Sequence, residues 1–79
     1  MNPAQTVLQS FETTSLTLAS FLRCRDFPIE SIKRHNGRTT FVFHDCPGLR
    51  ESVLEYTNDA PIAVRTFYNT LRDLKGITR

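Results

Sequence analysis

The chain has 79 residues, of which 39% are apolar and 23% charged, and it contains three glycines. This composition is ordinary for a folded globular chain and argues against disorder, and the length fits one small domain with a thin core. The formal net charge of +2 is too small for a polybasic binder of nucleic acids, but it allows a local cationic patch.

Residues 1–10 precede the first clear structural signal. Asn2 followed by Pro3 is typical of a helix start, which indicates a short helical turn through Ser10. The alternative is an N-terminal extension or arm. We predict a single domain that covers residues 1–79.

A short strand and a helix follow. Residues 11–14 alternate and are rich in β-forming side chains, which favours a short third strand beside the hairpin described next. Thr14 or Ser15 can cap a helix over residues 16–25, because a hydroxyl there can accept a backbone N–H bond. The buried face of this helix is indicated by apolar residues at helical spacing, namely Leu18, Phe21 and Leu22.

Residues 29–45 contain the strongest local signal in the chain, an Asn36-Gly37 pair between two alternating runs. Both central residues of a type I′ turn need a positive φ, which Asn tolerates and Gly adopts freely. The pair therefore predicts a β-hairpin with a two-residue loop.

A two-residue loop also predicts the register of the hairpin. His35 should lie opposite Arg38 and, at the far end, Glu30 opposite Phe43. One face then carries the apolar side chains Ile32, Phe41 and Phe43. The other, cationic face carries Lys33, His35, Arg38, Thr40 and His44, with Ser31 and Val42 among them. We find no acidic residue that would offset this positive face.

Two more helices are expected after the hairpin. Asp45 or Cys46 should cap the first, with Pro47 in its first turn. Its apolar positions are Leu49, Val53 and Tyr56. Residues 58–61 should end it, because Asn, Asp and Pro disfavour helix continuation there.

The last helix should begin between residues 61 and 65 and end at Gly76, a natural C-cap. We expect it to pack across the sheet and to contribute the largest share of the core. Its apolar positions form a long stripe, Val64, Phe67, Tyr68, Leu71 and Leu74.

The predicted fold class is α+β. A small antiparallel sheet, built from the hairpin at 29–45 and a third strand near 11–14, should be covered on one face by two or three helices. The other face is then bare or covered by a second copy of the chain. We therefore expect a homodimer, with Val42 exposed among the cations at the contact.

The chain resembles a family of small domains of unknown function found in phage and bacterial genomes. The resemblance runs from about Phe11 to Lys75. Its elements are Phe11-x-Thr13, the helix from Leu18 to Leu22, the basic hairpin that ends Phe41-x-Phe43-x-Asp45, the segment from Leu49 to Tyr56, and Arg65-x-Phe67 leading to Leu71 and Leu74-Lys75. The resemblance implies a fold and a phage or mobile-element setting, but no catalytic or binding residues.

Enzyme, metal and membrane functions have little support in the sequence. His35 and His44 lie at opposite ends of the hairpin, so they cannot share a zinc ion, and we expect no metal and no cofactor. Consecutive strand residues point to opposite faces, so His44 is badly placed to activate Asp45 or Cys46, and we expect no enzyme activity. With no signal peptide, no disulfide framework and no membrane span, we expect a cytoplasmic protein.

A binding function has better support, because cationic side chains gather in two places. The candidate ligand-binding residues are Lys33, His35 and Arg38 on the hairpin, and Arg65, Tyr68, Asn69 and Arg72 on the last helix. Arginine beside an aromatic ring can hold a phosphate and stack a base at once. We therefore predict capture of a phosphate-bearing ligand, a nucleotide or a nucleic acid. The alternative is a phage counter-defence inhibitor that binds a host defence protein.

Overall fold

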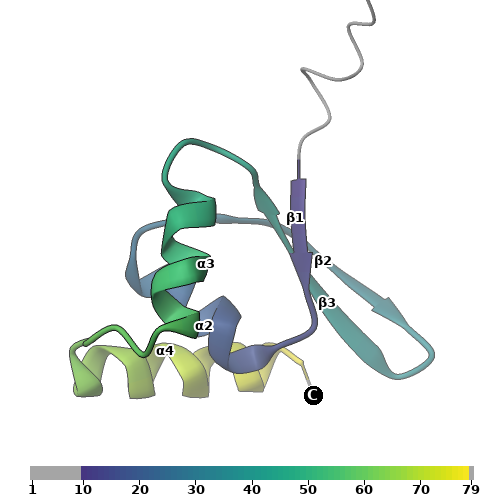
Figure 1. Cartoon of the computed structure of the whole chain (residues 1–79). Coiled ribbons are helices and arrows are strands. Elements are labelled where there is room, and N and C mark those ends of the chain that lie inside the picture. Colours follow the sequence, from purple (N-terminus) through teal and green to yellow (C-terminus); the bar gives the residue numbers. More distant parts are fainter. Residues whose placement is uncertain (1–9, 79) are drawn as a thin grey trace, which may run out of the picture.

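The computed structural model describes residues 10–78, which form a three-stranded antiparallel sheet with helices on one of its sides (Figure 1). The expected α+β fold is thus confirmed. The elements are β1 (Ser10–Thr13), α2 (Leu16–Cys24), β2 (Ile29–His35), β3 (Arg38–His44), α3 (Leu49–Thr57) and α4 (Val64–Ile77). The helical turn predicted in residues 2–10 falls almost entirely outside the described residues, and its last residue, Ser10, begins β1.

The strands are ordered β1-β3-β2, so the second arm of the hairpin is the central strand. The predicted turn is confirmed, with φ of 53° at Asn36 and 76° at Gly37. The pairing of β2 with β3 follows the predicted register from the turn as far as Ser31. Beyond that residue a bulge inserts Glu30, so Ile29 lies opposite Phe43 and the predicted partner was wrong.

The bulge has a clear consequence for burial. It turns Ile29 toward the core, against which this side chain packs, and leaves Glu30 exposed. An apolar side chain thus takes the place that strict alternation would have given to a carboxylate. The position of a bulge depends on which side chain the core accepts, and the alternation of the sequence alone does not reveal it.

The short first strand and the cap of the first helix are both confirmed. β1 pairs antiparallel with β3, with Phe11 opposite Phe43. The Ser15 Oγ accepts a hydrogen bond from the Leu18 backbone N–H at 3.1 Å, which satisfies one of the free donors at the start of α2.

The ends of the last two helices differ from the prediction. Neither Asp45 nor Cys46 caps α3, whose N-cap is Gly48 with φ of 92°. Asp45 instead accepts two hydrogen bonds from the Arg50 guanidinium, at 3.0 and 3.1 Å. Gly76 does not end α4, which continues through Ile77.

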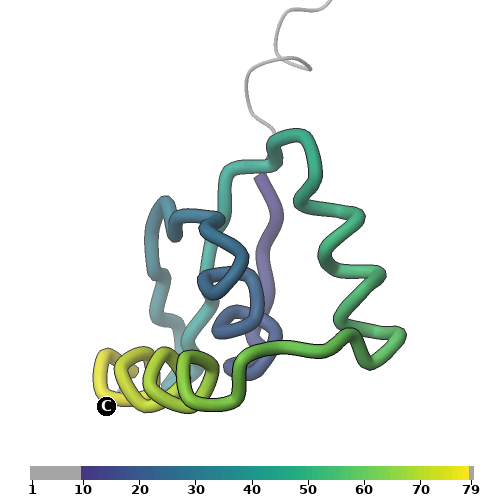
Figure 2. Tube along the Cα trace, turned by 90° about the vertical axis from the view of Figure 1, so that its left-hand side faces the viewer, coloured from purple at the N-terminus to yellow at the C-terminus, as the bar shows by residue number. Residues whose placement is uncertain are grey.

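The core is built mainly from α2 and the central strand, with α2 lying between the sheet and α4 (Figure 2). The buried apolar residues of the described chain are Ala19, Phe21, Leu22, Phe41, Val42, Phe43, Leu49 and Leu74. Only Leu74 of these belongs to α4. The expectation that the last helix contributes most of the core was therefore wrong.

Candidate functional site

The open face of the sheet, which the helices leave uncovered, carries the cationic residues of the hairpin as predicted. Lys33 does not stand alone there, however. Its Nζ lies 3.0 Å from the Glu12 Oε2, and the side chains of Lys33 and Glu12 are 61% and 45% exposed. Glu12 lies opposite Val42 on β1, so the ion pair spans the central strand. The expectation that no acidic residue offsets this face was wrong, although the alternation of residues 11–13 could have revealed Glu12.

The same ion pair corrects the predicted exposure of Val42. This side chain is only 5% exposed, although it belongs to the open face. Glu12 and Lys33 come from the two flanking strands and meet across β3, so their aliphatic stems cover the valine between them. Val42 is therefore not available as the dimer contact that its sequence position predicted.

His35 and Arg38 remain exposed at the tip of the hairpin. They face each other as the pair that closes the turn, so the imidazole and the guanidinium are neighbours. Two positive or potentially positive groups side by side favour an anion at this end of the sheet.

The cationic stripe of α4 is also exposed, and it points away from the core. At about 100° per residue, Arg65 and Arg72 lie roughly 160 to 180° around the helix from the buried Leu74. Tyr68 is 58% exposed, and the Arg72 guanidinium lies 5.9 Å from the centre of its ring. Tyr68 is thus a surface residue that contacts a cation. Asn69 is exposed beside them.

The two cationic sets do not converge on one site. The start of α4, which carries Arg65, lies at the opposite end of the molecule from the hairpin tip (Figure 1). A small nucleotide cannot contact both sets at once, whereas an extended strand could follow the surface from one to the other. The seven predicted site residues therefore divide into Lys33, His35 and Arg38 on one side and Arg65, Tyr68, Asn69 and Arg72 on the other.

One predicted site residue, Arg38, lines a concave feature. A cleft of about 400 Å³ lies beside the hairpin turn and close to the start of α2. Its lining includes Arg38 and three residues that carry a hydroxyl group, Thr14, Thr39 and Thr78. We call this feature the threonine cleft. The three threonines come from distant parts of the chain, so sequence patterns gave no signal for them.

Residues 10–78 contain neither a metal-binding cluster nor a membrane-spanning helix. No group of three or more His, Cys, Asp or Glu side chains in this range is arranged to hold a metal ion. No helix in the same range has the length and apolar character needed to cross a bilayer. Both cysteines, Cys24 and Cys46, are free and partly buried.

Comparison with known proteins places the chain in a family. A family model, the domain of unknown function DUF5659, matches residues 9–79. The chain belongs to this family. The match covers all the described elements, from β1 to α4, and the family description assigns no activity. No curated protein and no solved structure matches the chain.

Proposed function

We propose that this DUF5659 domain is a non-enzymatic binding protein that captures a phosphate-bearing ligand at the hairpin. The observation that carries the proposal is the threonine cleft, a concave surface whose lining includes Arg38 and three threonines. A guanidinium can donate two parallel hydrogen bonds to a phosphate, and hydroxyls can donate to its remaining oxygens.

The size of the cleft suits a small nucleotide. Its volume of about 400 Å³ falls within the range of about 300 to 1,000 Å³ that is typical of small-molecule sites. Leu16 and Phe41 contribute apolar lining next to the hydroxyls. A ligand with a charged end and a flat apolar body matches this mixture. The cytoplasm, where nucleotides are plentiful, is the compartment that the proposal implies.

A nucleic-acid strand is the second form of the same ligand class. It would extend from the hairpin tip across the open face, where Lys33 and His35 lie, and each phosphate contact would release counterions. Because Lys33 is already paired with Glu12, its contribution to such a strand would be smaller than that of Arg38.

Calorimetric titration with AMP, ATP, a cyclic dinucleotide and a single-stranded oligonucleotide tests the proposal. Arg38→Gln should weaken binding of the small nucleotide by about tenfold or more, because a hydrogen bond to a charged group contributes about 1.5 to 3 kcal/mol. Lys33→Gln should leave nucleotide binding unchanged but weaken binding of the oligonucleotide. Arg65→Gln is the charge-matched control, because Arg65 lies at the opposite end of the molecule. If none of these compounds binds the wild-type protein at low salt, the phosphate proposal is wrong.

A protein partner is the second candidate function, and the exposed surface of α4 favours it. Val64 is 77% exposed and Tyr68 58% exposed, beside the arginine that contacts the tyrosine ring. Tyrosine and arginine are the residue types that most often dominate protein interfaces. In a phage or mobile-element setting the partner would be a host defence protein, which this face would inhibit by binding. Loss of binding to a candidate partner in Tyr68→Ala, but not in Arg38→Gln, would support this function.

A further inference from the structure

One side of α4 has the residue spacing of a helix-packing seam and is open to solvent. In a heptad repeat, labelled a to g, the a and d positions form the contact between two packed helices. On α4 this alternating spacing of four and three residues is shown by Val64, Tyr68, Leu71 and Lys75. Val64 is 77% and Tyr68 58% exposed, and neither of the other two is buried. We call these four residues the α4 seam.

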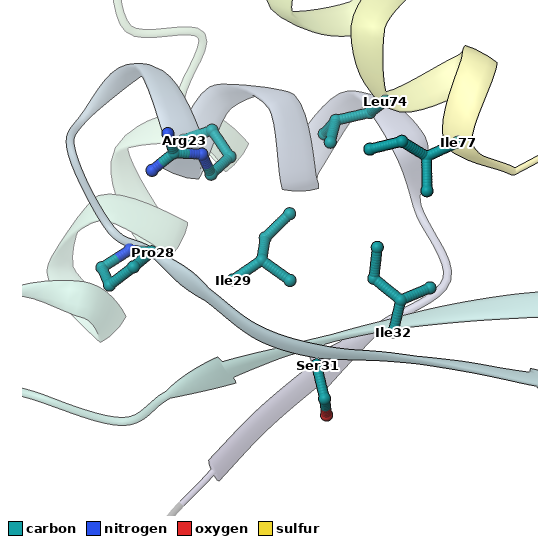
Figure 3. A pocket seen from close by; sticks show the side chains of 7 residues that line it. All are labelled: Arg23, Pro28, Ile29, Ser31, Ile32, Leu74 and Ile77. Atoms are coloured by element: carbon teal, nitrogen blue, oxygen red, sulfur yellow. The ribbon is translucent and has the colours of Figure 1, made fainter.

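A different side of α4 faces the rest of the domain. Leu74 and Ile77 point into an apolar cleft of about 550 Å³, into which Ile29 and Ile32 point from β2 (Figure 3). At about 100° per residue, the α4 seam is centred about 90° around the helix from Leu74, and Ile77 lies on the other side of Leu74. The α4 seam therefore faces away from this cleft.

Two arginines border the α4 seam on its outer side. Arg65 and Arg72 occupy the e position of the same heptads, which in coiled coils holds a charge that faces the partner helix. They lie about 10.5 Å apart along the helix axis, at 1.5 Å per residue. No carboxylate of residues 10–78 pairs with either of them, whereas Arg25, Lys33 and Arg50 each form an ion pair. The border of the seam thus carries positive charge that the described part of the domain does not offset.

We propose that the α4 seam binds an amphipathic α-helix of a partner protein, whose acidic side chains lie opposite Arg65 and Arg72. The inference rests on the second candidate function, the protein partner at α4, and names the chemistry of that partner. The apolar stripe of the incoming helix would cover Val64 and Tyr68, which removes apolar surface from water. Carboxylates two turns apart on that helix would match the spacing of the two guanidinium groups.

A second copy of the chain does not fit this surface. In an antiparallel pair the e positions of the two helices face each other, so the arginines of one copy would meet those of the other. In a parallel pair they would face the g positions, which are Phe67 and Leu74 and pack in the core of the domain. A nucleic-acid strand could contact the arginines through its phosphates, but it offers no aliphatic surface to Val64. The combination of charge and apolar exposure therefore favours an acidic helix.

Fluorescence anisotropy with two labelled designed peptides tests the proposal. Both are helices of about 21 residues, three heptads, with leucine at a and d. One has glutamate and the other lysine at e and g, and these like charges keep each peptide from pairing with itself. The glutamate peptide should bind the wild-type protein at micromolar concentration, and the lysine peptide should not bind.

Charge reversal on α4 should reverse this preference. Arg65→Glu and Arg72→Glu should each weaken binding of the glutamate peptide by about tenfold, because each brings like charges together. The double variant should bind the lysine peptide instead. Arg23→Glu is the matched control, since Arg23 is an exposed arginine on α2 that lines the cleft beside β2 and lies outside the seam. It should bind the glutamate peptide as tightly as the wild type does.

The apolar part of the contact has its own measurement. Tyr68→Ala should weaken binding of the glutamate peptide at low and high salt alike, whereas the loss in Arg65→Glu should shrink as salt rises, because salt screens charges. A wild type that does not bind the glutamate peptide, or that binds the lysine peptide equally well, would overturn the proposal. So would equal losses in Arg23→Glu and Arg65→Glu, or an affinity that Tyr68→Ala leaves unchanged. A single-stranded oligonucleotide that binds this face in place of the peptide has the same consequence.

The outcomes separate this inference from the functions proposed above. A partner protein that is lost in Tyr68→Ala but still binds Arg65→Glu would support the second candidate function and overturn the acidic helix. Titration with AMP should give the same result for Arg65→Glu as for the wild type, because the threonine cleft is formed without α4 residues before Thr78. A failed helix contact and a failed nucleotide site are therefore distinguishable.

Discussion

The central strand β3 and the last helix α4 differ in how well their apolar sequence patterns predict the depth of their burial. β3 buries three consecutive residues, Phe41, Val42 and Phe43, each 5% exposed or less. α4 has the longest amphipathic stripe in the chain, yet of its described residues only Leu74 is buried. A clear apolar pattern thus indicates the face that an element turns inward, but not how deeply that face is buried.

The difference follows from how many neighbours surround each element. β3 has a strand on each side, the helices on one face and the Lys33–Glu12 ion pair on the other. α4 packs mainly against α2, so most of its circumference faces solvent (Figure 2). A position at the centre of a layered domain loses nearly all its water whatever its sequence period.

The largest expected effect comes from removing a ring from β3. Phe43 is fully buried, and Phe43→Ala should cost about 3 to 5 kcal/mol, because it leaves a cavity that a well-packed core fills only in part. Since small domains often have no more stability than this, the variant should be largely unfolded. Urea unfolding followed by circular dichroism measures the change. A variant that keeps wild-type stability would show that β3 is not the centre of the core.

A smaller effect is expected from the corresponding ring on α4. Phe67 packs against the core but remains partly exposed. Phe67→Ala should therefore cost about 1 to 2 kcal/mol, because less apolar surface is lost and a smaller cavity is left than when a fully buried phenylalanine is truncated. Unfolding under the same conditions gives a direct comparison with Phe43→Ala. Equal losses in the two variants would break the contrast between strand and helix.

The smallest effect is expected on the outer face of α4. Tyr68→Ala should change the free energy of unfolding by less than about 1 kcal/mol, because it removes only an exposed ring and its contact with Arg72. Val64→Ala, at an even more exposed position, serves as the comparison. A large loss of stability in Tyr68→Ala would mean that this face of α4 is buried in a contact. The association of the protein with a partner should then be measured.

The sequence by itself determined the elements whose signals are local. Asn36-Gly37 specified the turn because only residues that tolerate a positive φ fit it, and the turn then fixed the register for the next five pairs. Ser15 specified the start of α2 for a similarly local reason, since its hydroxyl reaches a backbone N–H three residues away.

Tertiary structure decided the features that depend on contacts between distant residues. The bulge at Glu30, the pairing of Lys33 with Glu12 and the burial of Val42 arise only when β1, β2 and β3 lie side by side. The threonine cleft likewise joins residues from three separate segments. The charged and hydroxyl residues of a sequence indicate what kind of ligand a surface could bind. Whether these residues share one site is decided by tertiary packing, because packing brings together residues that are far apart in the sequence.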